Sequence, residues 1–208
     1  MPYFTETNQF EVLDFMRSHS FITLIGSLNG QSVATQIPIM IQGDINNLTL
    51  IGHVMRETDH CKALMSNPNV LALFTGAHCY VSAGWYAERG HASTWNYISV
   101  HARGTIKILN DRETLQVITE QTRMFEENQP KPQFVSALSE DYLQVGISAI
   151  AGFEMKVEEL YPIFKLSQNR DDKSYQNIVY MLEAQEDSGS HDIALEMRKR
   201  RKQLFLDN

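Results

Sequence analysis

The sequence predicts an α+β protein whose main part is an antiparallel β-barrel with flanking helices. Runs rich in β-branched and aromatic residues are short and are separated by turn residues. Asn29-Gly30 joins two of these runs, and this dipeptide is a strong hairpin signal. After Asp111 the spacing of apolar residues changes from alternation to the three-to-four spacing of a helix. Many short strands with close turns favour an antiparallel barrel over a parallel sheet.

The first half of the chain holds most of the predicted strands. A helix is predicted over residues 8–19, because Phe10, Leu13 and Met16 recur along one side. A short helix is predicted over residues 58–66 and ends at Asn67-Pro68. The predicted strands are residues 21–28, 32–41, 48–54, 70–74, 79–86 and 95–109.

The second half is predicted to be mainly helical. Asp111 is a plausible N-cap for a helix that Pro130 and Pro132 end. A last helix carries the basic run at residues 198–202, which we expect to be a dispensable tail. Between them we predict a helix at 140–150, a strand at 153–160, a polar loop at 165–170, a helix at 173–186 and a linker at 186–192.

The composition is that of a cytoplasmic globular protein. Of the 208 residues, 43% are hydrophobic and 21% are charged, which excludes global disorder. No apolar run approaches the roughly 20 residues that span a membrane, and the N-terminus does not resemble a secretory signal. Cys61 and Cys79 form no CxxC pair, so we expect reduced thiols.

Neither a metal site nor a catalytic nucleophile is predicted. The seven histidines lack familiar ligand spacing, and we expect them to be polar strand and loop residues. There is no GxSxG motif. We therefore assign no catalytic residue.

A phosphate site is one interpretation of residues 51–64. His53, Arg56, Thr58 and Lys62 lie where a predicted strand ends and a predicted helix begins. A helix N-terminus offers unpaired N–H groups, and cationic side chains add charge-assisted hydrogen bonds to phosphate. A solvated amphipathic helix is the alternative interpretation.

Residues 84–97, GWYAERGHASTWNY, contain both tryptophans in a polar, glycine-marked segment. Trp95, Asn96 and Tyr97 combine aromatic faces with an amide, which is what a flat heteroaromatic ligand requires. The alternative is that Trp85 and Trp95 plug the barrel mouth or a subunit interface.

Three segments carry a resemblance to a known family. HCYVSAGWY, STWNYISVHARGTIKI and AGFEMKVEELYPIFKLSQNR, in this order, resemble the PaiB family of FMN-binding negative transcriptional regulators. The resemblance runs from about Phe4 to Arg170, and TWNY and KLSQN are its most specific parts.

The resemblance implies a split β-barrel fold. In this fold we expect six antiparallel strands to form a closed barrel with flanking helices. It also implies a homodimer with FMN between two barrels. Residues 1–166 would form the FMN-binding barrel with its helices, and residues 167–208 a helical C-terminal extension of the same domain.

The resemblance also implies a set of cofactor-binding residues. Beside the flavin ring we expect Ala34 and Thr35; at the phosphate, His53, Arg56 and Lys62; and elsewhere around FMN, Trp95, Asn96, Lys165, Ser167, Gln168 and Asn169. The chain departs from the family pattern in two places. Glu57 and Asp59 bring negative charge to the turn beside the phosphate, and Ser93 replaces the proline before TWNY.

The sequence thus predicts an FMN-binding regulatory protein. An FMN-dependent oxidoreductase of the pyridoxamine-phosphate oxidase or flavin reductase kind, or a binder of heme or another flat ligand, are the alternatives on the same fold. DNA binding is possible through residues 198–202, but the net charge of −7 and the spread of five consecutive charges around a helix argue against direct contact.

Overall fold

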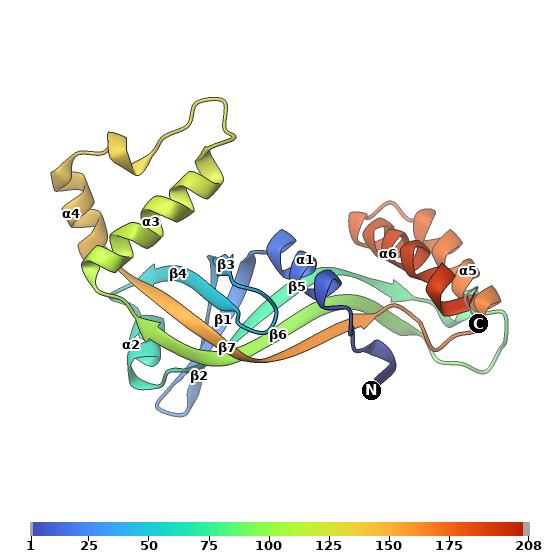
Figure 1. Cartoon of the computed structure of the whole chain (residues 1–208). Coiled ribbons are helices and arrows are strands. Elements are labelled where there is room, and N and C mark those ends of the chain that lie inside the picture. Colours follow the sequence, from blue (N-terminus) through green and yellow to red (C-terminus); the bar gives the residue numbers. More distant parts are fainter. Residues whose placement is uncertain (1, 206–208) are drawn as a thin grey trace. The chain divides into compact units, whose positions relative to one another are not determined.

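The computed structural model describes residues 2–205, and its elements are labelled in Figure 1. The chain divides into two compact units. Unit 1 comprises the described residues of Met1–Val12, Thr75–Val100 and Tyr161–Asn208; unit 2 comprises Leu13–Phe74 and His101–Leu160. The predicted division after residue 166 falls inside unit 1 and stays a prediction.

One antiparallel sheet runs in the order β2-β1-β5-β6-β7-β4-β3. The split-barrel class is confirmed, but the implied closed barrel of six strands is wrong, because the described sheet has seven strands and its ends are not paired. The strands are β1 (Phe21–Leu28), β2 (Gln31–Pro38), β3 (Met40–Gln42), β4 (Thr49–Met55), β5 (Asn69–Val81), β6 (Thr94–Ile108) and β7 (Ile150–Lys165).

Pro38 explains the additional strand. Residues 32–41 were predicted as one strand, but proline has no N–H to donate to a ladder, and β2 ends there. The next N–H, that of Ile39, donates to the Ser20 carbonyl at 2.9 Å. Ile39 itself is fully buried and is the single residue between β2 and β3 in the sequence. These two strands are the two edge strands of the sheet order.

The predicted hairpin is confirmed. Leu28 of β1 pairs with Gln31 of β2, which leaves a two-residue turn. Asn29 and Gly30 both have positive φ, 52° and 79°, as the turn that matches the twist of a hairpin requires.

Strands β5 and β7 are longer than predicted. The run at 70–74 and residues 79–81 belong to one strand, β5, because residues 75–78 contain no proline and continue its extended backbone. The rest of the strand predicted at 79–86 is wrong, since Ala83–Trp85 forms a short 3-10 helix. The strand predicted at 153–160 is the middle of β7. Gly104 of β6 fits closely against β7, since a Cβ there would lie 1.9 Å from the Lys156 carbonyl oxygen.

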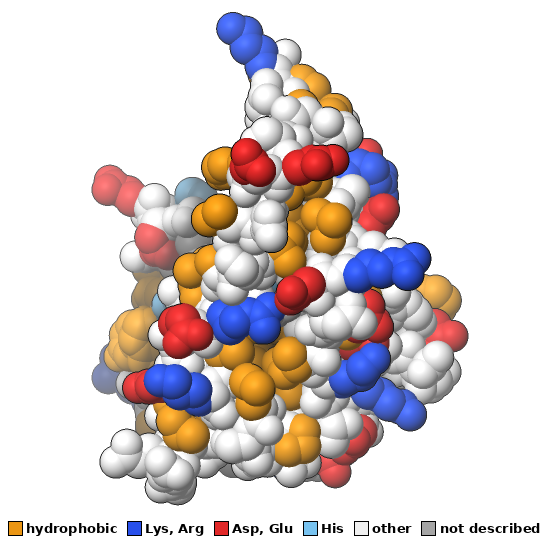
Figure 2. Space-filling view, turned by 90° about the vertical axis from the view of Figure 1, so that its left-hand side faces the viewer, with side chains coloured by type: hydrophobic (Ala, Val, Ile, Leu, Met, Phe, Trp, Pro, Cys, Tyr) orange, Lys and Arg blue, Asp and Glu red, His pale blue; other side chains and the backbone are white. Residues whose placement is uncertain are grey.

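Helices α1 (Gln9–Ser18), α2 (Asp59–Ser66), α3 (Asp111–Glu126) and α4 (Glu140–Ala149) agree with the predicted helices. The N-cap of α3 is Asn110 instead of Asp111, because Asn110 and Glu113 form a reciprocal capping box. Figure 2 shows the side of the molecule that carries α2, α3 and α4, where hydrophobic side chains lie among charged ones. Tyr142 and Val145 of α4 are among the exposed hydrophobic residues.

The predicted linker at 186–192 is wrong. Helix α5 (Asp172–Glu183) is followed closely by α6 (Ser188–Phe205), and the two pack side by side (Figure 1). The Asp187 carboxylate accepts from the Ser190 N–H at 2.8 Å, so the polar run begins a helix. Ile193, Ala194 and Met197 of α6 are buried, which argues against a dispensable tail.

Within residues 2–205, no helix has the length and apolar character needed to cross a membrane.

Candidate functional site

Unit 2 contains a cavity of about 590 Å³, within the range of small-molecule sites. It lies between two strands and the start of α2. Ala34, Thr35 and Gln36 line it from β2, His53 from β4, and Thr58 and His60 from the N-terminal end of α2. The structure therefore brings together three of the residues predicted to bind the cofactor: Ala34, Thr35 and His53.

His53 is held in a defined orientation. Its Nδ1 lies 3.0 Å from Oε1 of Gln121, and Gln121 donates from Nε2 to the Pro38 carbonyl at 3.0 Å. Because the glutamine presents its oxygen, Nδ1 of His53 is the donor and Nε2 is left as an acceptor in the neutral ring. Burial lowers the pKa of His53 and outweighs the opposing Gln121 hydrogen bond, so the neutral ring is favoured.

Arg56 does not line this cavity, and its guanidinium is engaged with the protein. Its Nε donates to the Ile150 carbonyl at 3.1 Å, and its Nη2 forms an ion pair with Asp111 at 2.9 Å. Arg56 therefore connects the end of β4 to the starts of α3 and β7. This structural role was not anticipated from the sequence.

Lys62 is an exposed residue of α2 and also lies outside the cavity lining. Its Nζ is 3.5 Å from the Asp59 carboxylate, and 60% of its side chain is exposed. An exposed pair of this kind is weak, so the ammonium group is free to exchange Asp59 for another anion.

The start of α2 is well formed. Thr58 is the N-cap, and its hydroxyl oxygen accepts from the Cys61 N–H at 3.2 Å while donating to the Met55 carbonyl at 2.7 Å. The remaining N–H groups of the first turn have no partner within a helix, which makes this end suitable for an acceptor group.

In unit 1 the structure brings the TWNY and KLSQN motifs into contact. Asn96 of β6 is fully buried and accepts from the Ser167 hydroxyl at 3.0 Å. The Asn96 amide donates to the Met197 sulfur of α6 at 3.5 Å. Ser167 has a φ of 61°, a conformation that non-glycine residues seldom adopt.

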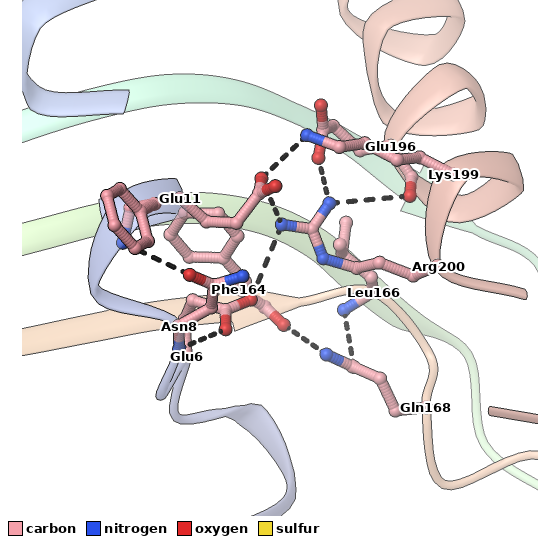
Figure 3. A network of polar contacts seen from close by, with 10 residues as sticks. Glu6, Asn8, Glu11, Phe164, Leu166, Gln168, Glu196, Lys199 and Arg200 are labelled. Atoms are coloured by element: carbon pink, nitrogen blue, oxygen red, sulfur yellow. Dashed lines mark hydrogen bonds and ion pairs between the residues drawn. The ribbon is translucent and has the colours of Figure 1, made fainter. Parts of the chain in front are cut away.

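The other KLSQN side chains mostly hold the loop itself. Lys165 donates from Nζ to the Thr94 hydroxyl at 2.6 Å. Gln168 accepts from the Leu166 N–H and donates to the Phe164 carbonyl, as Figure 3 shows. Asn169 is exposed. Ser167 and Gln168 thus act within the protein, whereas Asn169 is accessible to a ligand.

Trp95 is 54% exposed, so within this chain it does not plug a barrel mouth. Its ring lies 6.0 Å from that of Tyr80 and 6.2 Å from that of His78. An exposed indole beside two other rings offers a stacking surface to a flat ligand or to a partner chain.

A buried arginine in unit 1 was missed by the sequence reasoning. Arg200 of α6 reaches Glu6 at 3.4 Å, Glu11 at 3.3 Å and also Glu196, and its guanidinium lies 5.0 Å from the centre of the Phe164 ring (Figure 3). The sequence signal was only a five-residue basic run, in which nothing distinguishes Arg200 from its neighbours.

Three neighbours of Arg200 in the basic run are also paired. Arg198 bonds Glu183, Lys199 bonds Glu11, and Arg201 bonds Asp172. Four consecutive cations, residues 198–201, therefore have carboxylate partners, which leaves less positive charge for a nucleic-acid backbone.

Comparisons with known proteins place this geometry in context. The sequence matches the family described as "Putative FMN-binding domain" over residues 1–159. It is 30% identical over 192 residues to protease synthase and sporulation protein PAI 2 of Bacillus subtilis, an alignment that covers 92% of each chain.

Solved structures with a similar fold include one from Azotobacter vinelandii and one from Mycobacterium smegmatis. The flavocytochrome Anf3 of Azotobacter vinelandii gives a TM-score of 0.57 at 13% identity, with 78% of this chain and 69% of that chain covered. The FAD and heme binding protein of Mycobacterium smegmatis gives 0.53 at 15% identity, with 77% and 73% covered. At these identities the likeness establishes the fold alone.

Proposed function

Because the chain belongs to the family of FMN-binding domains, we propose that it is an FMN-binding regulatory protein of the PaiB type. The family match and the identity to PAI 2 confirm the resemblance to the PaiB family, with FMN as the cofactor. The regulatory role follows from that resemblance.

The cavity between β2, β4 and α2 is the observation that carries the proposal. Its volume of about 590 Å³ suits a flavin. The backbone of Ala34 and Thr35 would run beside the ring, and His53 would offer Nε2 to a donor on it. FMN supplies the redox chemistry of its ring when bound, and the residues described here bind and orient it.

The phosphate would lie at the start of α2. The N–H groups of the first helical turn favour an anion there, and Lys62 supplies a mobile cation. Arg56 would add a second cation from the turn before the helix, in addition to its bonds to Ile150 and Asp111. The proposed phosphate site is therefore the N-terminal end of α2.

Within unit 1, the family resemblance supports a second set of proposed cofactor contacts: Trp95, Asn96, Lys165, Ser167, Gln168 and Asn169. The exposed indole of Trp95 and the exposed Asn169 are the side chains available for direct contact. Asn96, Ser167 and Gln168 would instead fix the backbone that presents them, because their polar groups bond one another or the loop.

We also propose a cytoplasmic homodimer that regulates without contacting DNA directly. The resemblance supports the dimer, and the paired cations at residues 198–201 support the absence of direct DNA contact. Cys61 and Cys79 are buried and unpaired, and burial raises the pKa of Cys79 to about 12, as expected for inert reduced thiols. A mass measurement in solution tests the dimer; a monomer at micromolar concentration would contradict it.

A flavin-fluorescence titration with FMN and riboflavin tests the binding site. Lys62→Ala should weaken FMN roughly ten- to a hundredfold, since a charge-assisted hydrogen bond contributes about 1.5–3 kcal/mol, and riboflavin, which has no phosphate, should bind as before. Trp95→Ala should weaken both ligands alike. Lys131→Ala, at another exposed lysine, is the matched control and should change neither.

Arg56→Ala should also weaken FMN more than riboflavin, but it removes two structural bonds, so its urea midpoint must be measured alongside. If Lys62→Ala lowers the affinity for FMN and for riboflavin equally, the phosphate does not bind at the start of α2. Failure of the unaltered protein to bind either flavin would overturn the proposed function.

A further inference from the structure

His60 is a buried histidine whose ring has no hydrogen-bond partner. It is 6% exposed, and neither Nδ1 nor Nε2 is bonded to any described residue. The sequence reasoning had placed it among polar strand and loop residues, but it is the second residue of α2 and lies on the helix face that carries the buried Ala63 and Leu64. A buried polar group without a partner is costly, and most such groups in proteins are paired.

His60 is one of the residues that line the cavity of unit 2, together with Thr35, His53 and Thr58. Its ring packs near Gly26 of β1, where a Cβ would lie 3.7 Å from the His60 Cδ2 atom. Burial lowers the pKa of His60, so the free protein holds a neutral ring with one donor and one acceptor. Both ring nitrogens are covered by protein in the free chain, so a rotation of the ring would be needed to bring one of them to a ligand in this cavity.

The charged residues around the start of α2 indicate that an anionic group of a ligand would require an additional hydrogen-bond donor there. Glu57 and Asp59 flank Thr58 and carry negative charge, which opposes an anion at the N-terminus of α2. Lys62 is partly neutralised by Asp59. An additional donor on the cavity side of the same helical turn would offset this repulsion.

We propose that His60 is a cofactor contact and that its imidazole hydrogen-bonds the FMN phosphate at the start of α2. This inference rests on the proposed function. Binding requires the ring to rotate so that a nitrogen faces the cavity, and in the bound state that nitrogen acquires the partner that it lacks in the free protein. His60 thus costs stability in the free protein and contributes to affinity for the phosphate.

The test is to titrate His60→Leu with FMN and with riboflavin and to measure its urea midpoint without ligand. Leucine fills similar space without polar atoms. We expect FMN affinity to fall about tenfold or more, riboflavin affinity to stay unchanged, and the urea midpoint to stay equal or rise. His60→Gln, which restores a donor, should recover part of the FMN affinity. His191→Leu, at an exposed histidine of α6, is the control and should change neither affinity.

Three other outcomes overturn the inference in distinguishable ways. Unchanged FMN affinity in His60→Leu means that His60 does not contact the cofactor. Equal losses for both flavins together with a lower urea midpoint mean that His60 supports the fold. If the unaltered protein binds neither flavin, the proposed function fails and the inference fails with it.

Discussion

The Ser167 hydroxyl donates a hydrogen bond to the Asn96 side-chain oxygen at 3.0 Å, and both residues are buried although they are 71 positions apart in the chain. Asn96 belongs to TWNY and Ser167 to KLSQN. The Asn96 amide also reaches the Met197 sulfur, so helix α6 supports both motifs.

Ser167→Ala should lower the free energy of unfolding by about 1–3 kcal/mol, because it leaves the buried Asn96 oxygen without its donor. Alanine keeps the β-carbon, so the strained backbone at this position changes little and the loss reports the hydrogen bond. Urea unfolding measures it. Ser32→Ala, at an exposed serine of β2, should change the free energy by less than about 0.5 kcal/mol. An equal effect of the two substitutions would show that the Asn96–Ser167 bond is not important for stability.

Arg200→Leu should destabilise the protein by about 3 kcal/mol, because Glu6, Glu11 and Glu196 would then face one another without their shared cation. Arg198→Leu provides a control of the same residue type in the same helix. The Arg198 side chain is 59% exposed, against 10% for Arg200, so the loss of its solvent-screened pair with Glu183 should change the urea midpoint much less. Similar urea midpoints for the two variants would contradict this account of the α6 basic run.

Glu11 should make stability depend on acid pH. The hydrogen bond from Lys199, helped by the charges of Lys199 and Arg200, holds the pKa of Glu11 below its ordinary value of 4.5. A carboxyl group whose pKa is lowered by folding stabilises the folded protein above pH 4.5. This contribution disappears as the pH falls through the pKa of Glu11 in the folded protein. The difference in unfolding free energy between the unaltered protein and Glu11→Gln should therefore be constant near neutral pH and shrink below 4.5.

For Glu11, the control is Glu186→Gln, at an exposed glutamate that follows α5. Its difference from the unaltered protein should stay small throughout the titration. A Glu11→Gln difference that stays constant down to about pH 3 would show that Glu11 is not stabilised as a carboxylate.

Local patterns were enough to predict most of the fold. Asn29-Gly30 requires two positive φ angles that few other dipeptides adopt, so the hairpin could be placed from sequence. Two errors came from polar or proline residues with more than one structural role. Pro38 interrupts a strand that looks continuous, and Asp187 caps a helix within a run that looks like a linker.

The site was less predictable because it depends on contacts between distant segments. Ala34, Thr35 and His53 were identified through the family resemblance, and the structure places them around one cavity. Gln121 orients His53 across 68 residues, and no local pattern indicates that. The burial of His60 could be predicted only from its position three residues before Ala63, because residues at this spacing share a face of a helix and Ala63 is buried.

The most direct test of the central claim is titration of FMN with the purified, unaltered protein, followed by flavin fluorescence and visible absorption. The account predicts a saturable change in FMN fluorescence and a perturbed flavin absorption band, with riboflavin bound more weakly because it cannot use the start of α2. Flavin spectra that stay unchanged at protein concentrations well above that of FMN would contradict the claim that this barrel holds the cofactor.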